Sequence, residues 1–246
     1  MTGQPPHPTY SKELSQQQNL TAERRRRNRV LSAVLAAVLL IIGALIAVPL
    51  VRGELAPADR PAGPAGPADP GITVREDSHR LTEVPGSTVT LVEFLDFECE
   101  ACGAVFPAIE ELRAAYGDRV TFVVRYFPVP SHVNAERAAR AVEAAAQQGQ
   151  FEPMYRRMFE TQAGWGEQQT PMDARFRGYA QELGLDLEQW DRDYSAPETL
   201  ERIKADVRDG QTLGVEGTPT FFLNGTKLEP RSVDDLTRAL EEALAR

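Results

Sequence analysis

The feature that most restricts the fold of this chain is a ten-residue stretch without a polar face, at residues 88–97 (TVTLVEFLDF). The stretch is rich in β-branched and aromatic side chains, a pattern typical of a central strand buried between two layers. After Cys99 the spacing becomes helical, with Val105 and Ile109 on one face, and residues 120–127 (VTFVVRYF) have the composition of a second strand. This order predicts a parallel strand–helix–strand crossover and therefore an α/β fold.

The remainder of the C-terminal part predicts a helical insertion followed by a short hairpin. The insertion covers about residues 133–214, with helical segments at 135–148, 154–159, 174–183 and 197–213. A strand at 220–223 then meets Asn224 and Gly225, which form a strong two-residue hairpin turn, and an amphipathic helix follows. We therefore expect one α/β domain over residues 73–246, long enough to bury a single core.

A second constraint lies near the N-terminus, where residues 30–51 form a run of 22 residues without a charge. A helix of this length spans about 33 Å, enough to cross a hydrocarbon core of about 30 Å. Five arginines precede the run and only Arg52 follows it closely. The positive-inside rule therefore predicts a single-pass cell-membrane protein with a cytoplasmic N-terminus and an extracytoplasmic C-terminal domain. Cleavage as a signal peptide and a twin-arginine export signal are the alternatives.

The segments on either side of this run have different compositions. Residues 1–29 are polar and show no apolar period, which predicts a disordered cytoplasmic tail. Residues 52–72 are rich in Pro, Ala and Gly, with a proline at about every third position from Pro57 to Pro70. Such a sequence favours extended polyproline II structure, and we interpret it as a semi-rigid linker between membrane and domain.

Composition and charge exclude several classes of protein. The chain is 42% hydrophobic and 26% charged, which excludes a wholly disordered or multi-span membrane protein. Its net charge of −9 is unevenly distributed, because residues 1–52 carry +5 and the remainder therefore carries −14. Phosphate binding depends on basic surfaces, so we expect no nucleic-acid partner.

The chemistry of the chain is concentrated in its only two cysteines, which form the motif Cys99-Glu100-Ala101-Cys102 where the strand ends and the helix begins. At this spacing both sulfurs lie on one helical face and can form a small-ring disulfide. Cys99, at the helix N-terminus, lies beside unpaired backbone N–H groups that favour its thiolate. Cys102 lies one turn further in and should be more buried. The pair is suited to attack by Cys99 and resolution by Cys102.

Three other interpretations compete with a redox pair. A zinc site would need three or four ligands, and besides the cysteines only His7, His79 and His132 are available as histidines. A structural disulfide across so short a loop would constrain almost nothing. Two inert buried thiols are the third alternative. We expect no metal site and no cofactor, since the dithiol is itself the redox centre.

Further motifs resemble a known family. The CxxC motif follows a strand, Pro107 lies five residues after Cys102, and residues 217–220 (GTPT) precede a later strand. This arrangement resembles the thioredoxin superfamily. The helical insertion, with residues 127–132 (FPVPSH) and an Ala-rich helix ending at 148–151 (QGQF), resembles the DsbA-type extracytoplasmic thiol–disulfide oxidoreductases. The resemblance implies a thioredoxin-like fold with an inserted helical domain.

The resemblance also implies a substrate-binding loop. The Thr218–Pro219 bond is expected to be cis and packed beside the cysteines, with the Thr218 backbone free to pair with a substrate strand. An ordinary trans proline at the entrance of a strand is the alternative. The family often has a histidine at the position of His132, for which loop capping and an active-site role are both open.

Glu93 is a carboxylate within the strand that is apolar on both faces. Burial of an unpaired charge costs several kcal/mol, so we expect a raised pKa for this group. The superfamily often keeps a buried acid at this place, six residues before Cys99, and the resemblance implies proton exchange between Glu93 and Cys102. An edge-facing or salt-bridged glutamate is the alternative.

The residues around the cysteines bear on the direction of electron flow. Strong oxidants of the DsbA type often carry a histidine between the cysteines, whereas this chain has Glu100 and Ala101, with Asp96 and Glu98 just upstream. Nearby negative charge predicts a raised pKa for Cys99, weaker oxidising power, and a reduction potential between about −120 and −270 mV.

The predicted location nevertheless favours an oxidase. Its substrates would be exported cysteine-containing polypeptides, and a quinone-linked membrane partner would reoxidise it. A membrane-tethered reductase or isomerase, fed by a transmembrane reductant, is the first alternative. A redox-silent binding or chaperone module is the second, although such a module needs no paired cysteines.

Overall fold

The computed structural model describes residues 70–246. The predicted tail at 1–29 and transmembrane helix at 30–51 lie outside this range, as does the predicted linker at 52–72 up to Asp69. Within the range, no helix is long and apolar enough to span a membrane. The first described helix, α2 (Pro70–Thr73), begins inside the stretch interpreted as linker.

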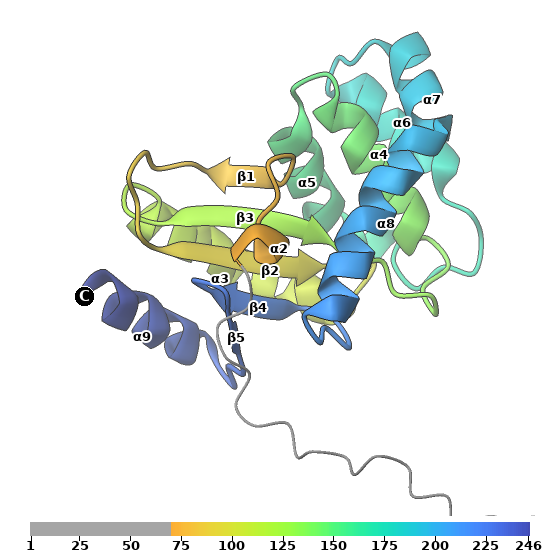
Figure 1. Ribbon diagram of the computed structural model, residues 1–246. Coiled ribbons are helices and arrows are strands. Elements are labelled where there is room, and N and C mark those ends of the chain that lie inside the picture. The colour runs from red at the N-terminus through yellow and green to blue at the C-terminus, as the bar shows by residue number, and fades with distance from the viewer. Residues whose placement is uncertain (1–69) are drawn as a thin grey trace, which may run out of the picture. The chain divides into compact units, whose positions relative to one another are not determined.

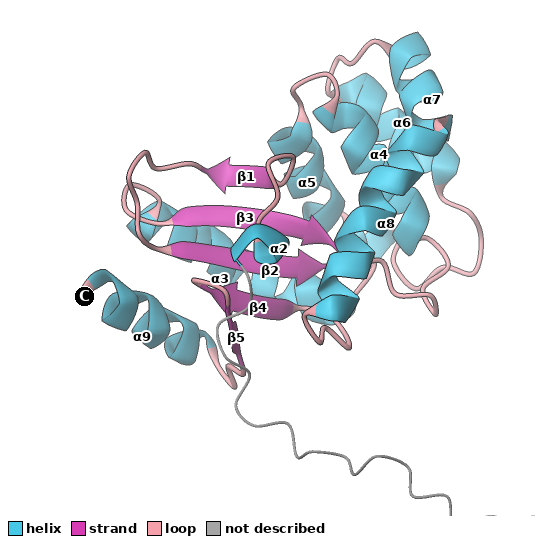
Figure 2. Cartoon of the chain, in the orientation of Figure 1, coloured by secondary structure: helices cyan, strands magenta, loops and turns pink. Residues whose placement is uncertain are grey.

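The elements alternate between sheet and helices in the order expected of an α/β fold (Figures 1 and 2). After α2 they are β1 (His79–Thr82), β2 (Thr90–Leu95), α3 (Glu100–Tyr116), β3 (Thr121–Tyr126), α4 (Ala135–Ala146), α5 (Phe151–Glu160), the 3-10 turn η1 (Gln162–Gly164), α6 (Asp173–Glu182), α7 (Leu187–Ser195), α8 (Pro197–Thr212), β4 (Thr220–Leu223), β5 (Thr226–Leu228) and α9 (Val233–Leu244).

The five strands form one sheet in the order β1-β3-β2-β4-β5. Strands β2 and β3 are parallel, with Glu93 opposite Val124 and Phe94 opposite Arg125, and the other pairs are antiparallel. Helices α3 and α9 cover one face, α2 and α8 lie on the other, and α4 to α7 form a block at the end of β3 (Figure 1). The predicted thioredoxin-like fold with inserted helices is confirmed.

Besides the short α2 and η1, the sequence analysis did not predict strand β1 and helix α7, because each of these two carries a single buried hydrophobic side chain. Strand β1 buries only Leu81, so it lacks the alternation that identifies a strand. Helix α7 buries only Trp190. Asp186 caps this helix by accepting a hydrogen bond from the Gln189 amide at 3.0 Å, which satisfies an N-terminal backbone donor that has no partner within the helix.

On the α8 face, the centre of the sheet holds a fully buried arginine. Arg125 lies on β3 and pairs with Asp206 at 2.7 Å and Asp209 at 2.6 Å, both from α8. It also donates to the carbonyl oxygens of Ile72 and Thr73 at 2.8 and 2.7 Å. One guanidinium thus fastens both α8 and the end of α2 to the sheet. Removal of one partner from such a buried pair costs about 3–5 kcal/mol.

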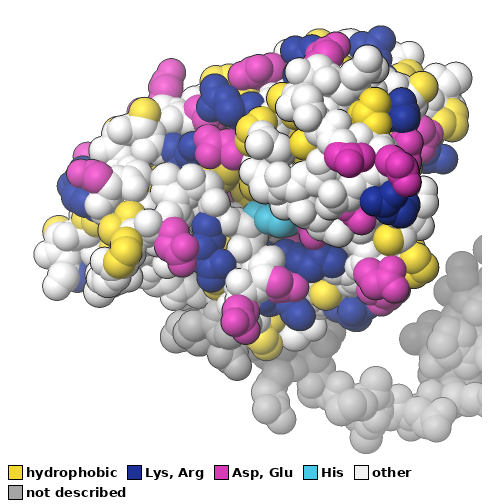
Figure 3. All heavy atoms as spheres, turned by 90° about the horizontal axis from the view of Figure 1, so that it is seen from above, with side chains coloured by type: hydrophobic (Ala, Val, Ile, Leu, Met, Phe, Trp, Pro, Cys, Tyr) yellow, Lys and Arg dark blue, Asp and Glu magenta, His cyan; other side chains and the backbone are white. Residues whose placement is uncertain are grey.

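Ion pairs on the surface contribute less to stability than these buried pairs. On the face shown in Figure 3, basic and acidic side chains are interspersed. Exposed pairs such as Arg177 with Asp191, at 2.8 Å, contribute about 0–1 kcal/mol each. The position of α8 therefore depends on the buried pairs of Arg125.

Gly210 provides a test of how closely α8 approaches the sheet. A Cβ at this position would lie 2.8 Å from the ring of Phe127 and 3.1 Å from that of Phe94. We expect Gly210→Ala to lower the free energy of unfolding by about 1–3 kcal/mol, because overpacking outweighs the gain in helix propensity. Chemical denaturation measures the effect.

Gly178, in α6, is the matched control. A Cβ there meets nothing within 4 Å, so Gly178→Ala should stabilise the protein by about 0.5–1 kcal/mol. Equal stabilisation by both substitutions would contradict the close packing of α8.

Candidate active site

The turn between β2 and α3 places Cys99 at the start of the helix. Cys99 is the N-cap of α3, with extended backbone dihedrals, and its amide donates to the Asp96 carbonyl at 3.2 Å. The Asp96 side chain accepts from the Glu98 amide at 2.8 Å, which fixes the turn from within. Both cysteines are unbonded thiols, and Cys99 is 9% exposed whereas Cys102 is 1% exposed. The more accessible sulfur is therefore that of Cys99.

The pKa of the Cys99 thiol is lowered to about 5. The hydrogen bond with the Cys102 side chain is the largest cause, and it outweighs the opposing effect of burial. The Thr218 side chain and the backbone amides of Ala101 and Cys102 stabilise the thiolate further. Cys99 is thus ionised at neutral pH.

Cys102 behaves in the opposite way. Its pKa is raised well above the ordinary value, first by burial, then by the hydrogen bond with Cys99 and by the nearby charge of Glu93. Two thiols three residues apart are therefore held in different protonation states at neutral pH, one as a thiolate and one as a thiol.

Glu93 lies on β2 beneath the active-site helix, 6% exposed. Its pKa is raised to about 8, mainly by burial and then by the charges of Cys99 and Glu110. The raised pKa predicted from the apolar strand is confirmed. The alternative of an edge-facing or salt-bridged glutamate is wrong, because β2 is central in the sheet and no ion pair involves Glu93 within residues 70–246.

The loop before β4 approaches the cysteines from the other side. The Thr218–Pro219 peptide bond is cis, as the resemblance implied, and the Cys99 Sγ lies 3.3 Å from the Thr218 carbonyl oxygen, to which the thiol donates when it is protonated. The Thr218 hydroxyl is buried and has no other hydrogen-bond partner among the described residues. It is therefore available to donate to the Cys99 thiolate.

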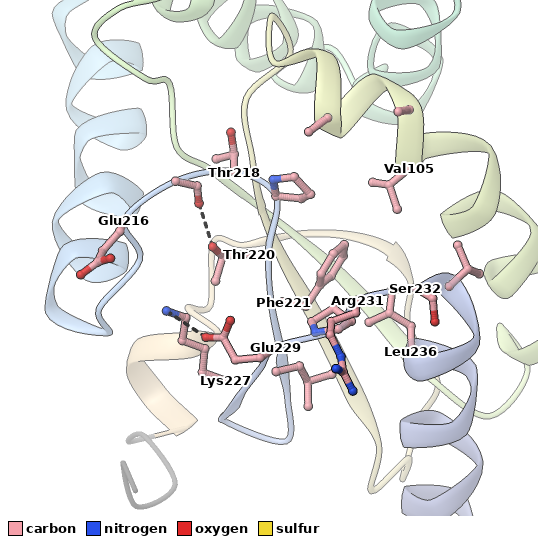
Figure 4. A pocket seen from close by; sticks show the side chains of 17 residues that line it. Val105, Glu216, Thr218, Thr220, Phe221, Lys227, Glu229, Arg231, Ser232 and Leu236 are labelled. Carbon is pink, nitrogen blue, oxygen red and sulfur yellow. Dashed lines mark hydrogen bonds and ion pairs between the residues drawn. The ribbon is translucent and has the colours of Figure 1, made fainter. Parts of the chain in front are cut away.

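A groove of about 640 Å³ runs from this loop along α3 towards α9 (Figure 4). Its walls are largely apolar, and charged side chains occur at Glu216, Lys227, Glu229 and Arg231. Ala101, between the cysteines, lines the groove, whereas Glu100 is exposed on the first turn of α3. An extended polypeptide that entered the groove would pass beside Ala101 and the loop of Thr218, whose carbonyl oxygen lies 3.3 Å from the Cys99 sulfur.

The inserted helical block also contacts the active-site turn. The sequence analysis did not predict this contact. Gln162, in η1, donates to the carbonyl oxygens of Phe97 and Cys99 at 2.7 and 2.8 Å. Its side chain occupies the space where a Cβ at Gly103 would lie. A glycine directly after the second cysteine was the available signal for this close approach, but it does not indicate which residue approaches.

The expectation that nearby acids raise the pKa of Cys99 is wrong, because the lowering hydrogen bonds prevail. Asp96 and Glu98 are both buried and accept hydrogen bonds from the loop between β3 and α4. Asp96 accepts from the Val129 amide at 2.9 Å and pairs with His132, and Glu98 accepts from the Asn134 amide at 2.5 Å. Both carboxylates therefore interact with hydrogen-bond donors of this loop.

The structure brings the predicted site residues together, with Cys99, Cys102, Glu93, Thr218 and Pro219 around one pair of sulfurs. Within residues 70–246, no cluster of three or more His, Cys, Asp or Glu side chains has the arrangement of a metal site. The arrangement can support nucleophilic attack by a thiolate and proton exchange at a buried thiol.

Alkylation tests the difference between the two thiols. We expect the rate of reaction of the reduced protein with iodoacetamide to be half-maximal near pH 5, with modification at Cys99 alone. Peptide mass mapping identifies the site. In Cys102→Ala the half-maximal pH should rise, because the largest stabilising hydrogen bond is lost. A wild-type midpoint above about pH 8 would contradict the assignment.

Burial of Glu93 makes stability depend on pH. The pKa of this carboxyl is about 8 in the folded protein against 4.5 for an ordinary glutamate, so the folded state loses stability as the pH rises through this interval. We expect Glu93→Gln to be little different in stability from the wild type near pH 5 and more stable by several kcal/mol near pH 9. Denaturation of the disulfide form, in which the cysteines do not titrate, measures this difference in stability. A difference that does not depend on pH would contradict the raised pKa of Glu93.

Comparison with known proteins agrees with this fold. A family model described as thioredoxin matches residues 84–242. A thioredoxin-like oxidoreductase from Silicibacter pomeroyi DSS-3 is 28% identical, with a TM-score of 0.62, over 73% of this chain and 99% of that chain. For alpha-DsbA1 of Wolbachia pipientis the identity is 16%, the TM-score 0.60 and the coverage 69% and 92%. For BdbD of Bacillus subtilis the values are 21%, 0.59, 69% and 94%.

The curated relatives are longer proteins that are named as Na(+)/H(+) antiporters. The chain is 39% identical over 163 residues to the Na(+)/H(+) antiporter NhaA 1 of Mycobacterium sp. (strain KMS), covering 64% of this chain and 25% of the relative. It is 34% identical over 201 residues to NhaA 3 of Salinispora tropica, covering 79% and 30%. The chain thus spans about a quarter to a third of the length of these relatives.

The family model covers more than half of the chain, and its range contains both cysteines, Glu93 and the cis-proline loop. The chain belongs to the thioredoxin family and has the DsbA-like form of the fold, with helices inserted between its two halves.

Proposed function

We propose that this protein is a thiol–disulfide oxidoreductase that works as an oxidase, introducing disulfides into other polypeptides. The observation that carries the proposal is the opposite displacement of the two thiol pKa values, down to about 5 for Cys99 and well above the ordinary value for Cys102. A stabilised thiolate favours the reduced form of the pair, which makes its disulfide a better oxidant.

The first step of the reaction uses the Cys99–Cys102 disulfide. A substrate thiolate attacks the Sγ of Cys99, a substrate–Cys99 bond forms, and the bond between the two cysteines breaks. Cys102 leaves as a thiolate and is protonated, because its pKa lies well above neutrality. Glu93, with a pKa of about 8, carries a proton at neutral pH and can supply it.

The second step releases the product. Another thiolate of the substrate attacks the substrate sulfur of the mixed disulfide, and the substrate disulfide forms. Cys99 leaves as a thiolate, for which its low pKa makes it a good leaving group. Two electrons have then passed from the substrate to the cysteine pair.

Thr218, Pro219 and the adjoining groove are suited to hold the substrate during these steps. An extended segment can pair with the Thr218 backbone while its flanking side chains enter the groove beside Ala101. Because Cys99 is only slightly exposed, its sulfur can be reached only by a polypeptide held in this position.

The proposed setting follows from the uncharged segment at residues 30–51. An anchor there would keep the domain on the extracytoplasmic side of the membrane, where cysteine-containing polypeptides emerge after export. Each turnover leaves the cysteines reduced, so a membrane partner linked to quinones would be needed to accept their electrons.

The equilibrium of the cysteine pair with glutathione tests the direction of electron flow. For the full chain in detergent we expect a reduction potential between about −120 and −180 mV. A value of about −250 mV or lower would identify a reductase and overturn the oxidase assignment. The interval matters, since DsbA at about −120 mV and thioredoxin at about −270 mV differ by roughly 7 kcal/mol.

The same preparation tests whether the cysteines carry the activity. Oxidation of a reduced, unfolded model substrate should be lost in the double variant Cys99→Ala, Cys102→Ala. A rate of disulfide formation with the wild type no higher than the background rate seen with this variant would instead favour a redox-silent binding module.

A further inference from the structure

The dipeptide between the cysteines provides no positive charge, but a histidine reaches the same turn from another segment. His132 lies in the loop between β3 and α4, and its Nδ1 is 2.6 Å from the Asp96 carboxylate. Asp96 is 1% exposed and accepts a second hydrogen bond from the Val129 amide, so its position is fixed. The main-chain carbonyl of the same aspartate accepts from the Cys99 amide. One residue therefore holds both the imidazole and the turn that carries the reactive sulfur.

The far end of this loop is also fastened. Glu98 accepts from the Asn134 amide at 2.5 Å. The Asn134 side chain donates to the carbonyl oxygens of Gln168 and Thr170 and accepts from the Met172 amide. The loop is thus tied to the active-site turn at both ends, which holds His132 in one place relative to Cys99.

We propose that His132 is a positioning residue for the proposed oxidoreductase reaction: held by Asp96, its imidazolium stabilises the Cys99 thiolate in place of a cation between the cysteines. The proposal rests on the proposed function and deepens it, since a charge that stabilises the thiolate also makes the disulfide more oxidising.

The charges around the imidazole support this role. Burial alone would lower the pKa of His132, but the hydrogen bond to Asp96 and the charges of Asp96, Cys99 and Glu98 together raise it. The group is therefore cationic over a wider pH range than an ordinary histidine. Asp96 links the two groups, since its side chain holds the imidazole while its carbonyl oxygen accepts from the Cys99 amide, and the charge of Cys99 is one of those that act on His132.

Titration of the wild-type protein gives the first test. If thiolate and imidazolium interact, the pKa of His132 must be higher in the dithiol form than in the disulfide form, where Cys99 carries no charge. NMR titration of the full chain in detergent, with labelled histidine, measures both values. His132→Gln identifies its resonance among the three histidines. Equal pKa values in the two redox forms would overturn the proposal.

Variants separate charge from structure. We expect His132→Gln to raise the pKa of Cys99 by about one unit and to shift the equilibrium with glutathione about tenfold towards the disulfide, about 30 mV. His132→Lys, which keeps a positive charge, should restore at least half of the pKa shift. An unchanged pKa in His132→Gln, or equal shifts in both variants, would show that the histidine only fastens the loop.

His79 provides the matched control. It pairs with Glu143 at 2.6 Å and stacks on Phe151, on the far side of β3 from the active-site turn. His79→Gln should leave the pKa of Cys99 unchanged. These measurements need neither a substrate nor a direction of electron flow. A low reduction potential would therefore refute the oxidase without affecting them, and an absent His132 effect would leave the oxidase standing.

Discussion

The burial of charge on both faces of the two central strands governs this structure. On the α8 face the charge is Arg125, which is fully buried and is compensated by two aspartates and two carbonyl oxygens. On the α3 face the charge is Glu93, which has no such partner among the described residues and whose pKa therefore rises to about 8. The first arrangement fixes helices to the sheet. The second leaves a protonated acid beneath the cysteines.

The position of the reactive sulfur depends on segments that lie far apart in the chain. Cys99 is held by the loop of Thr218, by Gln162 from the helical insertion, and by the turn that Asp96 and Glu98 fasten to the loop after β3. These contacts are hydrogen bonds between polar groups that are largely shielded from water. The loss of any one of them would leave a buried polar group unpaired and would lower the free energy of unfolding. The insertion is thus part of the active site as well as a cover for one end of the sheet.

The sequence allowed the site to be predicted where a residue conflicts with its surroundings. Glu93 was identified because a carboxylate interrupts an apolar strand, and the cysteine pair because of its spacing. Arg125 interrupts the second strand in the same way, and the same rule applied there would have predicted a buried partner. The aspartates that it binds, and Gln162, could not be found, since their contacts join residues about 60 to 85 positions apart. The lowered pKa of Cys99 was missed for a different reason, because the adjacent negative charges were counted and the hydrogen bond with Cys102 was not.

The unequal protonation of the two thiols fixes how many protons accompany the electrons. At any pH between the pKa of Cys99, at about 5, and the much higher pKa of Cys102, reduction of the disulfide yields one thiolate and one thiol. Two electrons are then taken up with a single proton, and the reduction potential falls by about 30 mV for each pH unit, half the slope of an ordinary dithiol. When the pH falls, the reduction potential of this cysteine pair therefore changes less than that of an ordinary dithiol.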